Sequence, residues 1–321
     1  MSTKTTVVIP NWNGKEYLRE CLDSLYEQGG VPIIVVDNGS NDGSVELLEQ
    51  CYPEVSLIRL EKNEGFCKAS NLGMQAAQTE YVFLLNNDTR VDKNCIPMLE
   101  AVLDGHKRTF SVQARLLSMK EPDRIDDAGD LYCALGWAFA LGKGKEITAY
   151  NKPAKVFAAC GGAVLYRKSM LDEIGMLDEN HFAYLEDIDL GYRALIYGYE
   201  NRMEPGAIVY HAGSATSGSR HNSFKVELSA QNSIYLIAKN MPILQILINL
   251  PFLLAGILVK AAFFLKKGLG KAYFAGLAKG IRLSLSTQGR EHKVRFNPSK
   301  TVDYVKIQVL LWINTIRRVA G

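Results

Sequence analysis

The 321-residue chain predicts an α/β protein with a mostly parallel sheet flanked by helices, followed by a helical C-terminal region. In the first half, short β-rich runs alternate with helical patterns, which is typical of βαβ units. Several of these runs are apolar without a break, as expected of strands covered on both faces. The hydrophobic and charged fractions, 47% and 22%, are those of a globular protein.

The first quarter of the chain contains the clearest elements. We expect strands at residues 5–10, 31–36, 56–60 and 81–85, and helices between them that include residues 45–50 and 66–77. Each strand runs into a polar or Gly-rich loop. Open parallel sheets bind ligands beyond the carboxyl ends of their strands. This pattern therefore predicts a nucleotide-binding half.

The strand at residues 81–85 leads directly into Asn86, Asn87 and Asp88. Beyond the end of a buried strand, Asp88 would lie in the crevice and could hold a hard cation against a phosphate. The alternative is that these three residues only supply turn and helix-cap interactions. The short stretch alone leaves both interpretations open.

The middle of the chain is less regular. Glycines interrupt residues 111–150, and we expect the Asp-rich segment 123–130 to be a solvated loop, with a substrate lid as the alternative. A new apolar run covers residues 156–166, a helix follows, and a strand at 207–210 ends in His211.

The C-terminal region differs from the rest in charge and pattern. Residues 239–321 contain 14 Lys and Arg against two acidic residues, a net charge of +12, whereas the preceding 238 residues carry 23 against 32, a net of −9. Residues 243–259 are almost entirely apolar, but a helix of that length spans only about 26 Å, less than a bilayer core. Pro251 and Gly256 interrupt it further.

Two apolar stripes follow in the same region. They repeat every three or four residues, with Lys and Arg nearby; one is Phe274, Leu277, Ile281 and Leu285, and the other is Val302, Val305, Val309, Trp312 and Ile316. Amphipathic cationic helices beside a long apolar run favour a membrane-surface region that faces anionic lipid. The alternative is a helical subdomain that packs on the core or on a second subunit. Nucleic acid is disfavoured as a partner, because the basic residues alternate with Leu, Ile and Phe.

The six cysteines form no Cys-x-x-Cys pair, and their scatter favours free thiols in a reducing compartment. The amino terminus lacks a charged segment followed by an apolar run, so we expect no signal peptide. These features predict a cytoplasmic location.

Five motifs occur in an order that is specific as a set. They are Val7–Gly14 (VVIPNWNG), Val35–Ser44 (VVDNGSNDGS), Asn63–Phe66 (NEGF) with Ala69, Asn71 and Gly73, Leu84–Asp88 (LLNND), and Tyr184–Leu190 (YLEDIDL). Together they resemble family 2 glycosyltransferases of the GT-A fold, and within that family the chain is most similar to bacterial rhamnosyltransferases. The resemblance covers about residues 4–240.

The resemblance implies a Rossmann-like GT-A domain at residues 1–238, and the charge and apolar pattern predict a membrane-associating helical region at 239–321. Within the GT-A domain, it implies a nucleotide-binding half at 1–92 and an acceptor-binding half at 93–238. The domain would bind a nucleotide sugar.

The resemblance also assigns residues to the donor. Asp37 would accept the imide N–H of uracil or thymine, and Pro10 and Asn11 would line the same base pocket; the local alternative for Asp37 is to cap the turn at Gly39. Asn63, Gly65 and Asn71 surround a helix start, where backbone N–H groups can face phosphate. A helix start also favours Asn for purely local reasons.

Asp88 matches the last acid of the family's Asp-x-Asp motif, which holds Mg²⁺ or Mn²⁺ against the donor diphosphate. Asn86 replaces the first acid, so Asn86 and Asn87 are expected to contact the donor as neutral groups. The resemblance implies that His211 completes the metal shell. An imidazole ligand shifts the preference from Mg²⁺ toward Mn²⁺.

Asp187 matches the general base of the family. If Glu186 opens a helix, Asp187 and Asp189 point to different sides, and Asp189 can pair with Arg193 four residues later. The alternative is that these carboxylates merely favour the amino end of the helix. One base and one displacement imply inversion at the anomeric carbon.

We therefore expect an inverting, metal-dependent hexosyltransferase at the cytoplasmic face of the plasma membrane, which transfers a sugar, with rhamnose favoured, from a dTDP- or UDP-sugar donor. The acceptor is expected to be a polyprenyl-linked saccharide used in cell-surface polysaccharide synthesis. The alternatives are a nucleotidyltransferase, which should carry a Gly-rich basic loop after the first strand, and a nucleotide-sugar-binding scaffold without turnover. The sequence leaves open whether the chain forms a homodimer.

Overall fold

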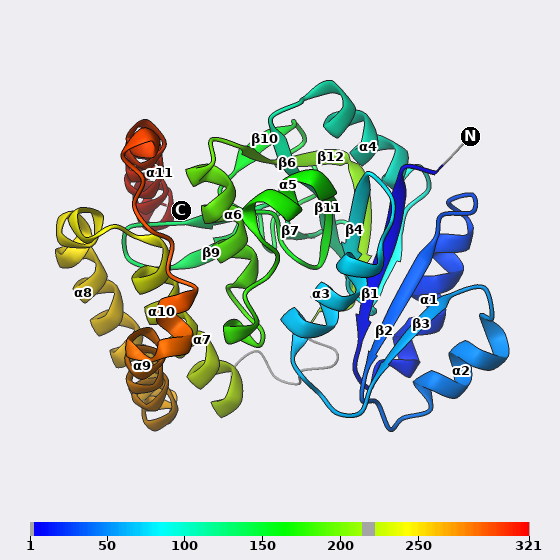
Figure 1. The fold of residues 1–321 in the computed structure, drawn as a ribbon, viewed down its shortest axis with the longest axis horizontal. Coiled ribbons are helices and arrows are strands. Elements are labelled where there is room, and N and C mark those ends of the chain that lie inside the picture. Colours follow the sequence, from blue (N-terminus) through cyan, green and yellow to red (C-terminus); the bar gives the residue numbers. More distant parts are fainter. Residues whose placement is uncertain (1–2, 214–221, 321) are drawn as a thin grey trace.

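The computed structural model describes residues 3–213 and 222–320 and shows one large twisted sheet with helices on both faces (Figure 1). In spatial order the main strands are β10 (Ala154–Val156), β12 (Glu200–His211), β6 (Thr109–Ser118), β11 (Ala163–Arg167), β4 (Tyr81–Leu85), β1 (Thr5–Asn11), β2 (Ile33–Asn38) and β3 (Ser56–Leu60). Two short strands, β5 (Thr89–Val91) and β7 (Ile125–Asp127), pair with β12 and β6. A separate hairpin joins β8 (Asp130–Tyr132) to β9 (Ala138–Ala140).

The strand directions divide the sheet into two halves. Strands β4, β1, β2 and β3 run parallel, as the alternating sequence pattern predicts. Strand β11 runs antiparallel to both β4 and β6 and links the halves, whereas β6 and β12 are again parallel. The predicted GT-A architecture, mostly parallel and flanked by helices, is confirmed.

The period-two alternation of the strands supplies a core to each face of the sheet. Val7 and Ile9 face one core, formed with α1 and α4, whereas Val8 and Val36 face the other, formed with α3, α5 and α6. The helices are α1 (Lys15–Tyr26), α2 (Ser44–Cys51), α3 (Phe66–Ala76), α4 (Cys95–Gly105), α5 (Lys168–Ile174) and α6 (Glu186–Ile196), with a 3₁₀ turn η1 (Glu179–His181) before α6.

The structure corrects the expectation that residues 111–150 are irregular. Strand β6 is ten residues long and lies near the centre of the sheet. Its polar side chains are buried, and they are paired: Ser111 donates to Asn201, and Gln113 donates to Asp127. Buried polar groups of this kind break the apolar run that marks a strand in the sequence. Strand β12 likewise begins at Glu200, well before the expected start at residue 207.

Residues 222–320 form five helices, of which α7 leads into the C-terminal region. They are α7 (Ser223–Asn240), α8 (Ile243–Lys266), α9 (Gly270–Leu285), α10 (Thr287–Glu291) and α11 (Thr301–Ala320), with a 3₁₀ turn η2 (Pro298–Lys300) before α11. Gly276 and Gly280 let α9 approach α7 closely, because a Cβ at either position would lie about 2.2–2.5 Å from a backbone oxygen of α7. The proposed division after residue 238 falls inside α7, two residues before its end.

Helix α8 corrects the estimate made from residues 243–259. It has 24 residues and continues through Pro251, so at 1.5 Å per residue it is about 36 Å long. Among the described residues, α8 is the one helix that is long and apolar enough to cross a membrane by length and composition. Only 22% of its most apolar stretch is buried inside the protein.

All six cysteines are free thiols, as the sequence predicts. Four of them are buried, Cys160 is partly buried and Cys51 is exposed. The fold is therefore held together by its cores and hydrogen bonds rather than by disulfides.

Candidate active site

A cavity of about 970 Å³ lies beyond the carboxyl ends of β1 and β4 and beside the amino end of α6. Its lining combines residues from both halves of the sheet and from the β8–β9 hairpin. The lining includes Pro10, Asn11, Trp12, Asn38, Asn63, Phe66, Asn86, Asn87, Asp88, Asp130, Phe139, Cys160, Gly161, Phe182, Tyr184, Glu186, Asp187, His211 and Phe224. Seven of the ten donor or metal residues expected from the sequence, together with the expected base, thus share one cavity.

Asparagine side chains connect the ends of β1, β2 and β4. Asn87 Nδ2 donates to Asn11 Oδ1 at 2.7 Å, and Asn11 Nδ2 donates to Asp37 Oδ1 at 3.0 Å. Asp37 Oδ2 accepts from the backbone N–H of Ser40 at 3.0 Å. Asp37 is buried behind Asn11 and is absent from the cavity lining, so in this structure it makes the local turn interaction.

Asn38 was not predicted as a site residue, yet it shapes the loop before α3. Its Nδ2 donates to Asn63 Oδ1 and to the Gly65 carbonyl, and its Oδ1 accepts from Glu64 N–H. Gly65 has a φ of 93°, and a Cβ there would lie 2.6 Å from the Phe182 ring. Glycine is therefore required by both the backbone and the packing. Asn38 directly follows Asp37 in the second motif, so the sequence did carry a signal for it.

Asn71 is not brought into the cavity. Its Nδ2 donates to the carbonyl of Leu177 at 2.9 Å and its Oδ1 accepts from the N–H of Leu177 at 3.1 Å. A second bond from Nδ2 reaches Glu179 Oε1. In this structure the amide joins α3 to the chain before α6.

Asp88 and His211 meet at the ends of two different strands. His211 Nε2 lies 3.3 Å from Asp88 Oδ1, and His211 Nδ1 lies 2.8 Å from Asp126 Oδ2. Asp126 also pairs with Lys143 at 2.6 Å. The expectation of a solvated loop at 123–130 is wrong, because β7 pairs with β6 and brings Asp126 to His211.

Charge interactions stabilise the triad of Asp88, His211 and Asp126. Burial lowers the pKa of His211, but its hydrogen bonds to Asp126 and Asp88 outweigh burial and raise the pKa to about 9. Burial works against ionisation of Asp126 as well, yet the bonds from His211 and Lys143 lower its pKa to about 2.

The donor atoms of the triad suit a divalent cation. Asp88 offers a carboxylate and His211 offers Nε2, and Asp126 holds the opposite ring nitrogen, as a supporting carboxylate does at many metal-bound histidines. This set of oxygen and imidazole ligands fits Mn²⁺ better than Mg²⁺. Asp126 is a residue that the sequence analysis missed; its only signal was an Asp-rich segment.

Asp187 and Glu186 begin helix α6 at the cavity, as the sequence predicts. Asp187 Oδ1 accepts from Ile188 N–H at 2.7 Å, and Oδ2 accepts from Gly161 N–H at 3.4 Å. Burial raises the pKa of Asp187, and these N–H groups partly oppose the shift. Burial, reinforced by the neighbouring Asp187, raises the pKa of Glu186 to about 8.

Three further groups lie near the acidic end of α6. Asp127, Asp130 and Cys160 have ligand atoms within 4.8 Å of one another, and Asp130 and Cys160 line the cavity. Burial raises the pKa of Asp127 to about 6, although Gln113 and Gly129 N–H donate to it. The sequence pattern did not single out these residues.

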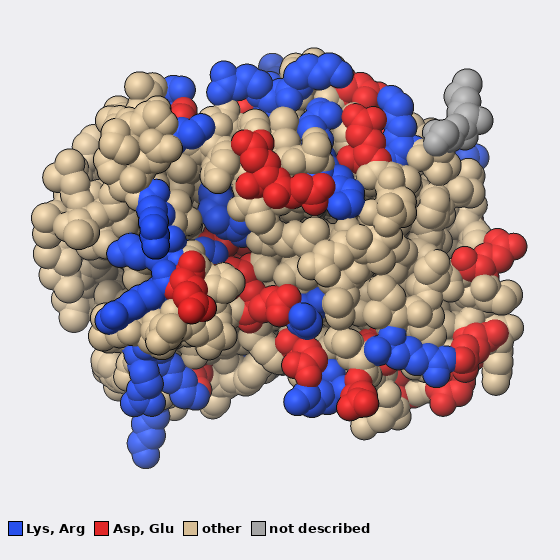
Figure 2. Space-filling model, viewed as in Figure 1, with Lys and Arg blue, Asp and Glu red and all other residues tan. Residues whose placement is uncertain are grey.

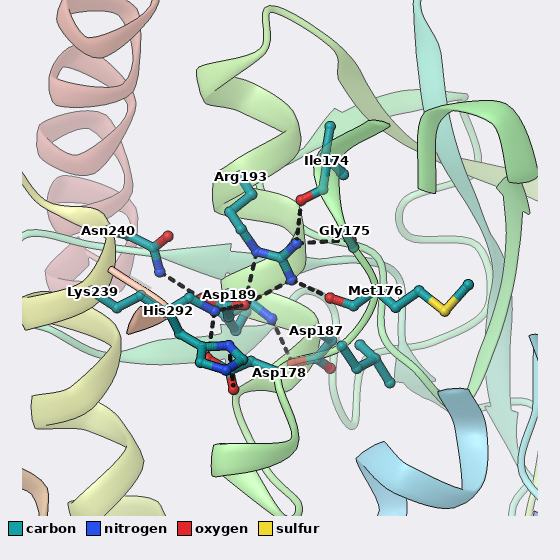
Figure 3. A network of polar contacts seen from close by, with 12 residues as sticks. Ile174, Gly175, Met176, Asp178, Asp187, Asp189, Arg193, Lys239, Asn240 and His292 are labelled. Carbon is teal, nitrogen blue, oxygen red and sulfur yellow. Dashed lines mark hydrogen bonds and ion pairs between the residues drawn. The ribbon is translucent and has the colours of Figure 1, made fainter. Parts of the chain in front are cut away.

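Asp189 does not line the cavity, and it anchors the helix that carries Asp187 (Figure 3). It pairs with Arg193 at 2.9 Å, as the spacing predicts, and also with Lys239 at 2.9 Å. Asn240 Nδ2 donates to its other oxygen at 2.7 Å. The buried network therefore fastens α7 to the amino end of α6.

The sheet order, the cavity at the strand ends and the acidic helix start define the chain as a glycosyltransferase of the GT-A class. The model of the family described as "Glycosyl transferase family 2" matches residues 6–175, and the chain belongs to that family.

Curated relatives share part of the chain. An N-acetylglucosaminyl-diphospho-decaprenol L-rhamnosyltransferase of Mycobacterium tuberculosis is 28% identical over 61% of this chain and 71% of that protein. A low-salt glycan biosynthesis hexosyltransferase, Agl10, of Haloferax volcanii is 28% identical over 59% of this chain and 61% of the relative.

Solved structures show the same fold at low sequence identity. S. aureus TarS 1–349 in complex with UDP-GlcNAc has a TM-score of 0.60 at 17% identity and covers 96% of this chain and 89% of its own. GalNAc-T7 with UDP, GalNAc and Mn²⁺ has a TM-score of 0.61 at 17% identity and covers 74% of this chain and 48% of its own.

Proposed function

We propose that the protein transfers a sugar, with rhamnose favoured, from a dTDP- or UDP-sugar to a hydroxyl of a polyprenyl-linked saccharide, with inversion at the anomeric carbon. One observation carries the proposal: a single cavity contains both the Asp88–His211 pair and the carboxylate of Asp187. The proposed contacts of the donor diphosphate and the proposed base for the acceptor hydroxyl lie around one ligand-sized space, which supports the proposal.

Asp187 is the proposed general base. It takes the proton from the acceptor hydroxyl while that oxygen attacks the anomeric carbon and the bond to the nucleoside diphosphate breaks. A raised pKa makes the carboxylate a stronger base than an exposed aspartate. Because the displacement occurs once, the configuration at the anomeric carbon inverts.

Asp88 and His211 are the proposed ligands of Mn²⁺ or Mg²⁺, with Asp126 orienting His211. A bound divalent ion supplies electrostatic stabilisation to the negative charge of the leaving diphosphate. On the donor side, Asn86, Asn87, Asn63 and the backbone at Gly65 would bind the diphosphate and sugar.

For the nucleobase, we propose a pocket at the end of β1 and β2. Pro10 and Asn11 line the cavity there, and Asn11 connects the cavity to Asp37. A carboxylate oxygen can accept more than one hydrogen bond, so Asp37 can keep its bonds to Asn11 and Ser40 and accept the imide N–H after a small movement of Asn11.

The proposal of a lipid-linked acceptor rests on the C-terminal helices. Large apolar side chains that would pack inside a helical subdomain are instead exposed on α8, α9 and α11, among them Leu244, Leu258, Ile281, Val305 and Ile316. Figure 2 shows a largely uncharged surface over these helices, with Lys and Arg near its boundary. Exposed apolar area with a basic edge favours the surface of an anionic membrane. We propose a location at the cytoplasmic face of the plasma membrane.

The proposal is tested by comparing transfer with donor binding in Asp187→Asn. The variant keeps the size of the side chain and one of its two acceptor oxygens but removes the base, so transfer should fall by about 10²–10⁴-fold. Thermal stabilisation by the donor should remain, because a ligand of the native state raises the apparent stability. Asp123→Asn, at an exposed position, is the matched control.

A screen of dTDP-rhamnose, UDP-galactose, UDP-galactofuranose and UDP-N-acetylglucosamine with Mn²⁺ identifies the donor by the same stabilisation. Full transfer activity in Asp187→Asn would disprove the assignment of the base. Stabilisation by none of the four donors would contradict the proposed donor class.

A further inference from the structure

A second cavity, of about 790 Å³, lies where the C-terminal region meets the α/β domain. One wall comes from the segment between α10 and α11, and the other comes from the chain between α5 and α6 together with the end of α6. It shares no lining residue with the donor cavity. In Figure 2 this face is hollowed between the two parts of the protein, with Lys and Arg gathered along it.

The acidic groups of this cavity are already paired. Asp178 accepts from Lys239 at 2.7 Å and from Tyr235 at 2.8 Å, and His292 lies 3.4 Å from its other oxygen. Glu179 lies 3.3 Å from Lys68 and accepts from Asn71. These carboxylates therefore contribute little free negative charge to the cavity.

The cations on the wall between α10 and α11 have no such carboxylate partners among the described residues. Within residues 3–213 and 222–320, no carboxylate lies within 4 Å of Lys293, Arg295 or Lys300. Lys300 is held over the Tyr197 ring, with its Nζ 5.3 Å from the ring centroid, and so stays at the rim.

Helix α7 adds a buried cation, Lys239, one of whose ammonium hydrogens has no acceptor among the described residues. Lys239 is only 3% exposed and uses two of its three ammonium donors, on Asp178 and Asp189, among the described residues (Figure 3). Arg193 is saturated, because its guanidinium donates to Asp189 and to three backbone carbonyls. The cavity thus combines fixed and exposed cations around a space that could hold an anion.

We propose that this second cavity binds a phosphate-bearing group, with Lys293 and Arg295 as the main contacts and Lys239 at its base. The cavity is large enough to hold a diphosphate or a phosphorylated headgroup. Arg and Lys bind phosphate oxygens through charge-assisted hydrogen bonds, which are the strong class. The site is independent of the transfer reaction. The phosphate could belong to a lipid headgroup or to a soluble compound.

The first test uses inorganic pyrophosphate as the probe. Calorimetric titration of the full chain in EDTA at low salt compares the wild type with Lys293→Ala/Arg295→Ala. The matched control is Lys107→Ala/Lys152→Ala, which removes the same charge from exposed positions of the α/β domain that do not line the cavity. We expect the wall variant to weaken binding by about tenfold or more and the control by less than about twofold.

The source of the phosphate is decided with phosphatidylcholine vesicles prepared with and without phosphatidic acid. If the wall variant loses binding to the phosphatidic acid vesicles while the control keeps it, the site takes a lipid headgroup. If only pyrophosphate binding changes, the site takes a soluble phosphate compound. Both results support the phosphate site.

Three results would overturn the proposal. They are wild-type protein that binds neither probe, equal losses in the wall variant and the control, and pyrophosphate binding that is displaced by UDP and unaffected by the wall variant. The last result would place the probe in the donor cavity. Because Lys293 and Arg295 are exposed, unchanged thermal unfolding should show that the wall variant remains folded.

Discussion

Nε2 of His211 lies 3.3 Å from Oδ1 of Asp88, although one residue ends strand β12 and the other follows strand β4. The far side of the same imidazole contacts Asp126 from a third strand. An acid that follows β4 and a histidine from the other half of the sheet therefore meet only in the folded chain. A ring fixed on one side by a carboxylate presents its other nitrogen in a defined direction.

Replacing Asp126 with Asn should weaken Mn²⁺ binding by about 10–100-fold, since the orienting carboxylate of a metal-bound histidine typically contributes this much. The measurement is a Mn²⁺ titration in the presence of UDP. Asp123→Asn serves as the control, because Asp123 is 73% exposed and belongs to the same segment. Equal affinities for both variants and the wild type would exclude a role of Asp126 at the metal site.

Replacing Lys239 with Met should destabilise the fold by about 3–5 kcal/mol, because Asp178 and Asp189 would lose the cation buried between them. Denaturant unfolding measures the change. Lys306→Met removes an exposed cation that pairs with Asp303 and should cost less than about 1 kcal/mol. A cost for Lys239→Met as small as that of the control would contradict the anchoring role of the network.

His181 should make the protein less stable in acid. The ring is buried and faces Asp189, Lys239, Asp178 and Arg193; burial is the largest effect and lowers its pKa from 6.5 to about 4. Between these two pKa values, His181 is protonated in the unfolded chain but neutral in the folded chain. This contribution to stability is complete above pH 6.5 and is lost progressively as the pH falls toward 4.

Thermal unfolding measured between pH 7 and about pH 4 tests this pH dependence. Stability falls as the pH falls in the range where the unfolded state binds more protons than the folded state. His181→Phe should flatten the decline, whereas His106→Gln, at an exposed position, should leave it unchanged. A decline equally steep in His181→Phe would assign the acid sensitivity to other groups, of which Asp178 and Asp189 have lowered pKa values.

Replacing Leu244, Leu247 and Leu258 with Gln should reduce binding to vesicles that contain phosphatidylglycerol. All three side chains are more than half exposed on α8, so the substitutions remove apolar area without opening a cavity. Flotation of the protein with vesicles measures the effect. Met98→Gln replaces an exposed apolar residue of the α/β domain and should leave binding unchanged. Unaltered flotation of the α8 variant would remove the support for membrane attachment through this helix.

Local sequence determined the parallel half of the sheet, β1 to β4. Strands such as Tyr81–Leu85 are continuous apolar runs, and their ends carry the polar motifs, so both the parallel sheet and the position of Asn86, Asn87 and Asp88 follow from neighbouring residues. Helix geometry alone predicted the Asp189–Arg193 pair, because residues four apart lie on one side of a helix. The same geometry places Asp187 on a different side of the helix, where it lines the cavity.

The tertiary structure decided what depends on residues far apart in sequence. Strand β6 was missed because Ser111 and Gln113 are buried with hydrogen-bond partners that come from other strands. The same pairing carries Asp126 to His211, while Asn71, which sits in a recognisable motif, turns to Leu177 instead of the donor cavity. A sequence pattern reports local periodicity and residue type, whereas hydrogen bonds between distant strands form only when the whole sheet is assembled.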